Sequence, residues 1–145
     1  MWTLRRMKVL DVEPLVILDV YTKEIKSLLE RAVPAWNRGL TQKQVADIER
    51  VQRVAVSVIL SDCKTGYYNM ALVILDLEPL DVRRENLCKT FAKKTLKSRH
   101  TDICKVNPHQ HYTRNKQEFF VNRCNTRRYF NSPLNYLTRL LNNEQ

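Results

Sequence analysis

The sequence predicts an all-α fold, a small helical bundle with a long basic, partly irregular segment before a C-terminal helix. Three observations support this prediction. The 145 residues include only two glycines, the alternation typical of β-strands is scarce, and apolar residues recur at helical spacing. Hydrophobic residues make up 43% of the chain, which is enough to bury one modest core.

Three helices are predicted in the first half of the chain. Residues 2–10 form a short basic segment that resembles the end of a helix. Pro14 suits the first turn of a helix running to about residue 32. Thr41 and Gln44 have the spacing of a capping box, which predicts a helix over 41–60. The apolar residues expected to recur along the second of these helices are Leu15, Leu18, Tyr21, Ile25, Leu28 and Leu29.

The second half begins with a loop predicted over 62–68. Asn69 is then expected to cap a short helix through Leu77. Pro79 marks the start of a helix to residue 97, and Ser132-Pro133 marks the start of a closing helix. The apolar side of the helix after Pro79 is expected to be Leu80, Leu87, Phe91 and Leu96. The closing helix carries the apolar stripe Leu134, Leu137, Leu140 and Leu141, which we expect to be core.

We expect three parts in the domain organisation. Residues 1–97 form a helical domain, and residues 132–145 form a helix that packs back on it. Between them, over 98–131, helical periodicity fails and polar residues dominate. This composition predicts an extended or partly disordered basic segment.

The net charge of +10 is concentrated in one third of the chain. From Arg83 to Arg128 there are 13 lysines and arginines against three acids, while the 12 bases and 12 acids elsewhere cancel. Lysines and arginines that neutralise phosphates release condensed counterions, so such a concentration favours an anionic partner. RNA, an RNA–DNA hybrid and DNA are the candidates. A basic surface that only keeps the protein soluble is the alternative.

Two patterns within the basic third suit nucleic-acid binding. Lys89, Lys93 and Lys97 are four residues apart and form a ridge on one helix, although an ordinary solvent face gives the same pattern. Aromatic residues alternate with basic ones further on, which suits base stacking or anchoring to the core. These aromatic residues are Tyr112, Phe119, Phe120, Tyr129 and Phe130. The candidate binding residues are Arg83, Arg84, Lys89, Lys93, Lys94, Lys97, Arg99, Arg114, Lys116, Arg123, Arg127 and Arg128.

No motif in the sequence supports catalysis or a cofactor. The chain has no Asp-Asp pair of the kind that holds two cations in a polymerase, and no phosphate loop or nucleophile motif. The four cysteines include no CxxC pair, and we interpret them as reduced thiols. A structural zinc through Cys88, His100, Cys104 and His109 has suitable ligand types but not the spacing of a zinc finger. We therefore expect no enzyme activity and no cofactor.

The sequence also has no motif for membrane insertion or secretion. No apolar stretch reaches the ~20 residues that cross a bilayer, and basic residues interrupt the apolar ones near the N-terminus. We expect a soluble intracellular protein that does not bind membranes. Nuclear and cytoplasmic locations are both compatible with the sequence.

Short blocks of residues follow one another in a specific order. They are Leu28-Leu29-Glu30, Ala32-Val33-Pro34-Ala35-Trp36, Leu40-Thr41, Gln44, residues 48–55, Tyr68, Ala71-Leu72, Leu77, Pro79-Leu80, Arg83-Arg84, Leu87-Cys88, Phe91, Lys93-Lys94, Tyr129, Ser132-Pro133-Leu134, Tyr136-Leu137 and Leu140-Leu141-Asn142. Over nearly the whole chain, this order resembles the C-terminal region of jockey-like, LINE-type non-LTR retrotransposon reverse transcriptases. Arg31 departs from the family, which often has an aromatic residue there.

The resemblance implies a thumb-like domain over 1–97 and a post-thumb region after it, where the parent enzyme would grip template RNA and the primer hybrid. The family's catalytic Asp-Asp motif has no matching position in this chain. We therefore expect a nucleic-acid-binding fragment of a reverse transcriptase, an RNA-directed DNA polymerase, without catalytic residues of its own. The alternative is a structural or interaction relic of the transposable element. Such a relic would bind no nucleic acid and would self-associate through the apolar surface that once packed on the missing palm.

Overall fold

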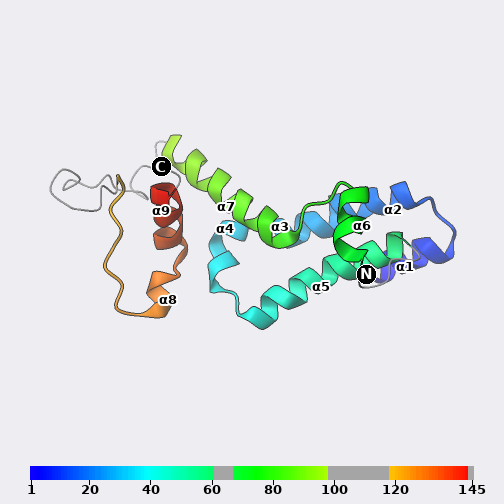
Figure 1. Cartoon of the computed structure of the whole chain (residues 1–145), viewed down its shortest axis with the longest axis horizontal. Coiled ribbons are helices and arrows are strands. Elements are labelled where there is room, and N and C mark those ends of the chain that lie inside the picture. The colour runs from blue at the N-terminus through cyan, green and yellow to red at the C-terminus, as the bar shows by residue number, and fades with distance from the viewer. Residues whose placement is uncertain (61–66, 98–117, 144–145) are drawn as a thin grey trace. The chain divides into compact units, whose positions relative to one another are not determined.

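The computed structural model describes residues 1–60, 67–97 and 118–143, and the secondary structure of these ranges is helical, with no strand. The predicted all-α fold class is confirmed. The elements, shown in Figure 1, are α1 (Trp2–Val9), α2 (Pro14–Val20), the π-helical segment Tyr21–Lys26, α3 (Ser27–Glu30), α4 (Val33–Trp36), the 3₁₀ turn Asn37–Gly39, α5 (Gln42–Ile59), α6 (Tyr68–Ile74), α7 (Leu80–Lys97), α8 (Arg127–Phe130) and α9 (Pro133–Asn143).

The chain divides into two compact units. The first unit comprises Met1–Arg31 and Thr41–Arg83, and the second comprises Ala32–Leu40 and Arg84–Gln145. The predicted division into 1–97, 98–131 and 132–145 stays a prediction, because residues 98–117 lie outside the described ranges.

The first unit packs α1 against α2 and α5, and α6 against α5. Its core is almost entirely apolar. The buried residues of this core are Leu4, Ile17, Tyr21, Ala55, Val56, Ile59, Ala71, Leu72 and Leu77. The helix predicted over 41–60 is confirmed as α5, and its capping box is formed. Thr41 Oγ1 accepts from the Gln44 N–H at 3.3 Å, and Gln44 Oε1 accepts from the Thr41 N–H at 2.8 Å.

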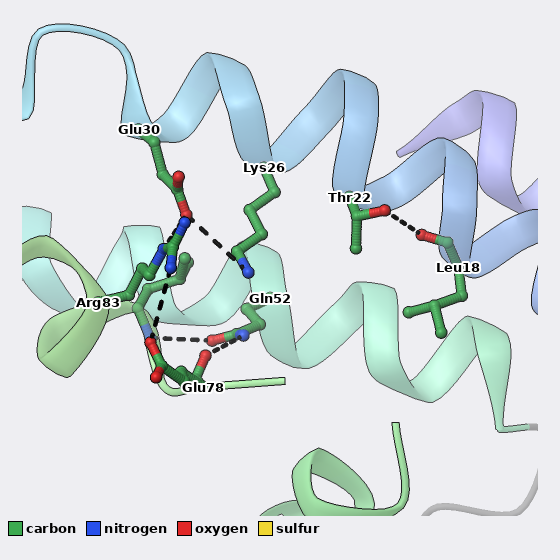
Figure 2. Close-up of polar contacts among 8 residues, drawn as sticks. Leu18, Thr22, Lys26, Glu30, Gln52, Glu78 and Arg83 are labelled. Atoms are coloured by element: carbon green, nitrogen blue, oxygen red, sulfur yellow. Dashed lines mark hydrogen bonds and ion pairs between the residues drawn. The ribbon is translucent and has the colours of Figure 1, made fainter. Parts of the chain in front are cut away.

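One buried amide connects three segments of the first unit. Gln52 of α5 is fully buried, and its Nε2 donates to the carbonyl of Glu78 at 2.9 Å. Its Oε1 accepts from the Tyr68 hydroxyl at 3.0 Å and from the Leu80 N–H at 3.2 Å. Figure 2 shows this amide beside the start of α7. Gln52 therefore satisfies backbone groups that have no helical partner where α7 begins.

An ion-pair cluster lies next to this amide (Figure 2). Arg83 Nε is 3.1 Å from Glu30 Oε1, and Arg83 Nη1 is 4.0 Å from Glu78 Oε2. Lys26 Nζ is 4.0 Å from the same Glu30 oxygen. The first turn of α7 is thus held to the end of α3 by charge, and to α5 by the Gln52 hydrogen bonds.

Three described residues other than glycine have a left-handed backbone, and they lie after α1, at the N-cap of α4 and after α6, respectively. Asp11, Ala32 and Asp76 have φ of 57°, 54° and 51°. Asp76 ends α6 in a Schellman motif, because the Leu77 N–H donates to Leu72 O and the Asp76 N–H donates to Val73 O. The helix predicted to reach Leu77 therefore stops at Ile74. It also begins at Tyr68, which places the predicted cap Asn69 inside the helix.

The helix predicted over 14–32 differs from expectation in its middle and in its buried face. It ends at Glu30 and contains the π-helical segment after α2, where the Thr22 hydroxyl donates to the carbonyl of Leu18 at 3.1 Å (Figure 2). Leu15 and Leu28 are 66% and 67% exposed, whereas Ile17 is fully buried. The apolar residues cover a wide arc of this helix, and its neighbours bury only part of that arc.

The second unit has a core formed by α4, α7, α9 and one residue of the chain between α7 and α8. Its buried residues are Val33, Cys88, Ala92, Phe119, Tyr136, Leu137, Leu140 and Leu141. The prediction for the closing helix is confirmed for Leu137, Leu140 and Leu141, but Leu134 is 39% exposed. Helix α8 corrects the expectation of an irregular segment through residue 131, because Thr126 caps a short helical turn over Arg127–Phe130.

Candidate nucleic-acid interface

Helix α7 has a buried stripe and a lysine-bearing side. Arg84, Cys88, Ala92 and Thr95 are buried and recur at helical spacing. The predicted apolar side was therefore wrong in part: Leu80 is buried and Leu87 and Leu96 pack beside the core, but Phe91 is 45% exposed. The stripe consists of small and polar side chains, which hydropathy alone does not mark as core.

The lysines lie on the other side of α7. At 100° per residue, Lys93 and Lys97 project opposite to Cys88. Lys93, Lys94 and Lys97 are exposed. Lys89 is half-buried, and its Nζ lies 3.8 Å from Glu85 Oε1, which offsets part of its charge. Of the predicted ridge, Lys93 and Lys97 therefore face solvent, and Lys94 is exposed beside them.

The two arginines at the start of α7 are placed differently. Arg83 belongs to the first unit and forms the ion pairs with Glu30 and Glu78. Arg84 belongs to the second unit and is 3% exposed. Arg84 is therefore buried, and the charge of Arg83 is partly offset by Glu30 and Glu78.

A second group of basic residues surrounds α8. Arg123, Arg127 and Arg128 are all exposed. Asn135 and Arg139 of α9 hold the backbone of this segment: Asn135 Nδ2 donates to the carbonyl of Tyr129 at 2.9 Å, and Arg139 Nη2 donates to the carbonyl of Phe130 at 2.6 Å. The Tyr129 carbonyl also accepts from the Ser132 N–H, so the side chains of α9 add to the backbone bonds at the end of α8. The α8 arginines are thereby presented from a fixed backbone.

The aromatic residues of the basic segment divide into anchors and exposed rings. Phe119 is 8% exposed, and its N–H and carbonyl both bond the side-chain amide of Asn142, at 3.0 Å each. Phe120, Tyr129 and Phe130 are each about half exposed. The Arg139 guanidinium lies 3.5 Å from the centroid of the Phe130 ring and covers one face of it. The anchoring interpretation is confirmed for Phe119, and base stacking stays a prediction for the exposed rings.

Sequence reasoning did not single out Asn135, Arg139 and Asn142 as the residues that position this segment. A signal was available. They recur at positions i, i+4 and i+7 of α9, so they share one face of this helix, across from the leucine stripe. Three further candidate binding residues, Arg99, Arg114 and Lys116, lie outside the described ranges, as does Tyr112.

The described residues contain no cluster of histidine, cysteine, aspartate or glutamate side chains that could hold a metal ion. Cys88 is buried, and burial raises the pKa of its thiol, which disfavours the thiolate that metals bind. Its Sγ lies 3.7 Å from Asn37 Nδ2. The other residues of the zinc hypothesis, His100, Cys104 and His109, lie outside the described ranges.

Within the same ranges, none of the helices has the length and apolar character needed to span a bilayer.

Comparison of the chain with protein-family models, with curated proteins and with solved structures finds no match.

Proposed function

We propose that this chain is a nucleic-acid-binding fragment related to the thumb and post-thumb region of a LINE-type reverse transcriptase, and that it grips the phosphate backbone without catalytic residues of its own. The observation that carries the proposal is the lysine side of α7. Lys93, Lys94 and Lys97 face solvent opposite the buried stripe of this helix. Such a surface contacts phosphates without reading base sequence.

Two further features support the proposal. The exposed Arg123, Arg127 and Arg128 add charge near α8, and the half-exposed Phe120 and Tyr129 add aromatic surface next to them. Cations and aromatic rings together suit single strands, because phosphates take the charge and bases stack on the rings. The sequence has no Asp-Asp pair, so in this proposal polymerisation belongs to the parent enzyme and not to this chain.

The test is the salt dependence of binding, measured by fluorescence anisotropy with single-stranded RNA, an RNA–DNA hybrid and duplex DNA. Replacing Lys89, Lys93, Lys94 and Lys97 together by Gln should weaken binding. It should also flatten the slope of log affinity against log salt by up to ~0.9 per lost contact on duplex DNA, or ~0.7 on single strands. The same affinity and slope as the wild type would reject the role of α7.

A charge-matched comparison separates contact from net charge. Lys93→Gln with Lys97→Gln removes two positive charges from α7, and Lys23→Gln with Arg31→Gln removes two from the first unit. If α7 contacts phosphate, the first double variant should lose much more affinity than the second. Equal losses would mean that only the overall charge attracts the nucleic acid.

A second candidate, a protein-interaction surface, is favoured by α6. Its residues Met70, Val73 and Ile74 are 65%, 80% and 72% exposed, and their spacing places them on one side of the helix, away from the buried Ala71 and Leu72. An apolar patch of this kind marks an interaction site. Salt-insensitive self-association in analytical ultracentrifugation, abolished by Val73→Ser with Ile74→Ser, would support this candidate. A monomer at high concentration would count against it.

A further inference from the structure

A groove lies between α1 and α5 in the first unit, and none of the candidate interface residues lines it. These two helices are in contact, as Figure 1 shows near the N-terminus. The groove has a volume of about 340 Å³ and is lined by Arg5, Lys8, Val9, Ser57 and Val58. Its volume is at the lower end of the range for pockets that hold small molecules. Its lining combines two cations with apolar side chains.

Trp2 extends this lining along α1. It precedes Arg5 by three residues and Val9 by seven, so all three side chains lie on one face of the helix. Trp2 is 77% exposed and Val9 is 74% exposed. Helix α1 contains no acidic residue, and Arg6 adds a further exposed cation beside this face. A fully presented indole ring beside cations is a stacking surface for nucleic-acid bases.

The positive charge continues from the groove along α5. Arg53, Arg50 and Lys43 precede Ser57 by four, seven and fourteen residues, so they lie on one face over roughly 20 Å of helix. All three are exposed, and the Arg53 guanidinium lies 5.2 Å from the Tyr68 ring. Two acids flank this edge, Asp47 on one side and Glu49 on the other. In the described ranges, neither groove cation forms an ion pair, and none of the three α5 cations does.

We infer that the α1–α5 groove and the basic edge of α5 form a second binding surface, for single-stranded nucleic acid. A nucleotide combines a flat, weakly polar base with a charged phosphate. The groove offers Trp2 and Val9 to the base and Arg5 and Lys8 to the phosphate, and the α5 cations face the phosphates that follow. A duplex hides its bases from such a surface, so the single strand fits better.

The inference shares one assumption with the proposed function, namely that the chain binds nucleic acid. It involves different residues, all in the first unit, and it predicts a higher overall affinity. Two surfaces on one chain that engage the same strand raise the overall affinity by effective concentration, without any new contact at either surface.

The first experiment measures affinity for a labelled oligouridylate in a salt series. The groove variant, Arg5→Gln with Lys8→Gln, should bind roughly three- to tenfold more weakly at low salt, with the slope reduced by up to ~0.7 per lost contact. The control variant, Lys23→Gln with Arg31→Gln, removes the same charge elsewhere in the first unit and should bind like the wild type. Circular dichroism of each variant should match the wild type, because the substituted side chains are not fully buried.

The second experiment measures binding at the groove by the quenching of tryptophan fluorescence. Oligouridylate should quench the tryptophan fluorescence of the wild type, and Trp2→Phe should lose most of that quenching. The second tryptophan, Trp36, still fluoresces in both proteins. The groove variant should show the same loss at equal ligand concentration. Quenching that persists in Trp2→Phe, or equal quenching of the wild type by polyglutamate, would overturn the assignment of this surface to nucleic acid.

The outcomes separate the two proposals. If the wild type binds, the α7 variant is weakened and the groove variant is not, the second surface is wrong and the proposed function stands. If the groove variant is weakened and the α7 variant is not, the groove carries the binding and the role given to α7 is wrong. A wild type that binds no oligonucleotide overturns both.

Discussion

The two units of the chain hold their backbones in different ways. The core of the first unit is apolar and closes around one buried amide, Gln52. Four of the five buried polar or charged residues found in the described ranges belong to the second unit, and these four are Arg84, Thr95, Asn135 and Thr138. Thr95 and Thr138 donate to carbonyls of their own helices, and Asn135 bonds the end of α8.

The first unit packs helices on helices, and helices satisfy most of their own backbone groups. The second unit also holds the non-helical chain around Phe119 and the short helix α8, and their backbone groups take further partners from elsewhere. Side chains of α9 supply them, through Asn142 to Phe119, Asn135 to Tyr129 and Arg139 to Phe130. The comparison shows that side-chain hydrogen bonds from a short helix, here α9, can hold the backbone of an irregular basic segment in place.

The largest effect is expected where the first unit depends on a single polar group. Gln52→Leu keeps the side-chain size but leaves the Glu78 carbonyl and the Leu80 N–H without their partner. Each buried group left unsatisfied costs about 1–3 kcal/mol, so the free energy of unfolding should fall by about 3 kcal/mol. Urea denaturation followed by circular dichroism measures this change. Gln42→Leu, the same replacement at an exposed position of α5, should change little, and equal effects of the two would refute the role of Gln52.

A smaller effect is expected from the polar fastening of the second unit. Asn135→Ala removes the bonds to the Tyr129 carbonyl and to Cys124 Sγ. The free energy of unfolding should fall by about 1–2 kcal/mol, and the amides of α8 should exchange faster with solvent. Hydrogen-exchange mass spectrometry measures the exchange of the α8 amides, with Asn143→Ala as the exposed control. Unchanged exchange in α8 would show that Asn135 does not hold this segment.

The ion pairs of the first unit should contribute less than its buried amide. Arg83→Gln breaks the contacts to Glu30 and Glu78, which are partly exposed, so we expect a loss of about 0.5–1 kcal/mol. Lys23→Gln breaks a pair with Asp19 whose side chains are 71% and 55% exposed, and its loss should be close to zero. A double-mutant cycle of Arg83→Gln with Glu30→Gln isolates the coupling, which should shrink at high salt. A coupling of zero would show that the Arg83–Glu30 ion pair does not stabilise the first unit.

Effects of opposite sign are expected at two exposed alanines. Ala32 has a φ of 54°, which glycine adopts without strain, so Ala32→Gly should raise stability by about 0.5 kcal/mol. Ala46 lies inside α5, and Ala46→Gly should lower stability by about 1 kcal/mol. Thermal or urea unfolding of the two variants is sufficient. A loss of stability from Ala32→Gly would show that the left-handed turn is not strained by its side chain.

Much of the candidate interface could be predicted from spacing. The ridge of Lys89, Lys93 and Lys97 is exposed at Lys93 and Lys97, as the helical period requires. Arg83 and Arg84 follow the same charge pattern but are placed in an ion-pair cluster and in the second core. Composition cannot separate these cases, because a basic residue has the same charge whether it faces solvent, an acid or a core.

By itself, the sequence determined the fold class, where most helices begin, and the position of the net charge, because these depend on residues close together in the chain. The capping box at Thr41 and the prolines before α7 and at the start of α9 are examples. The tertiary structure alone decided which part of each apolar arc is buried, such as Ile17 instead of Leu15, and the small stripe of α7 instead of Phe91. It also decided that Asp11, Ala32 and Asp76 take left-handed turns. Each of these outcomes depends on neighbours distant in sequence: packing against another helix chooses the buried face, and the energy of that packing offsets the local strain.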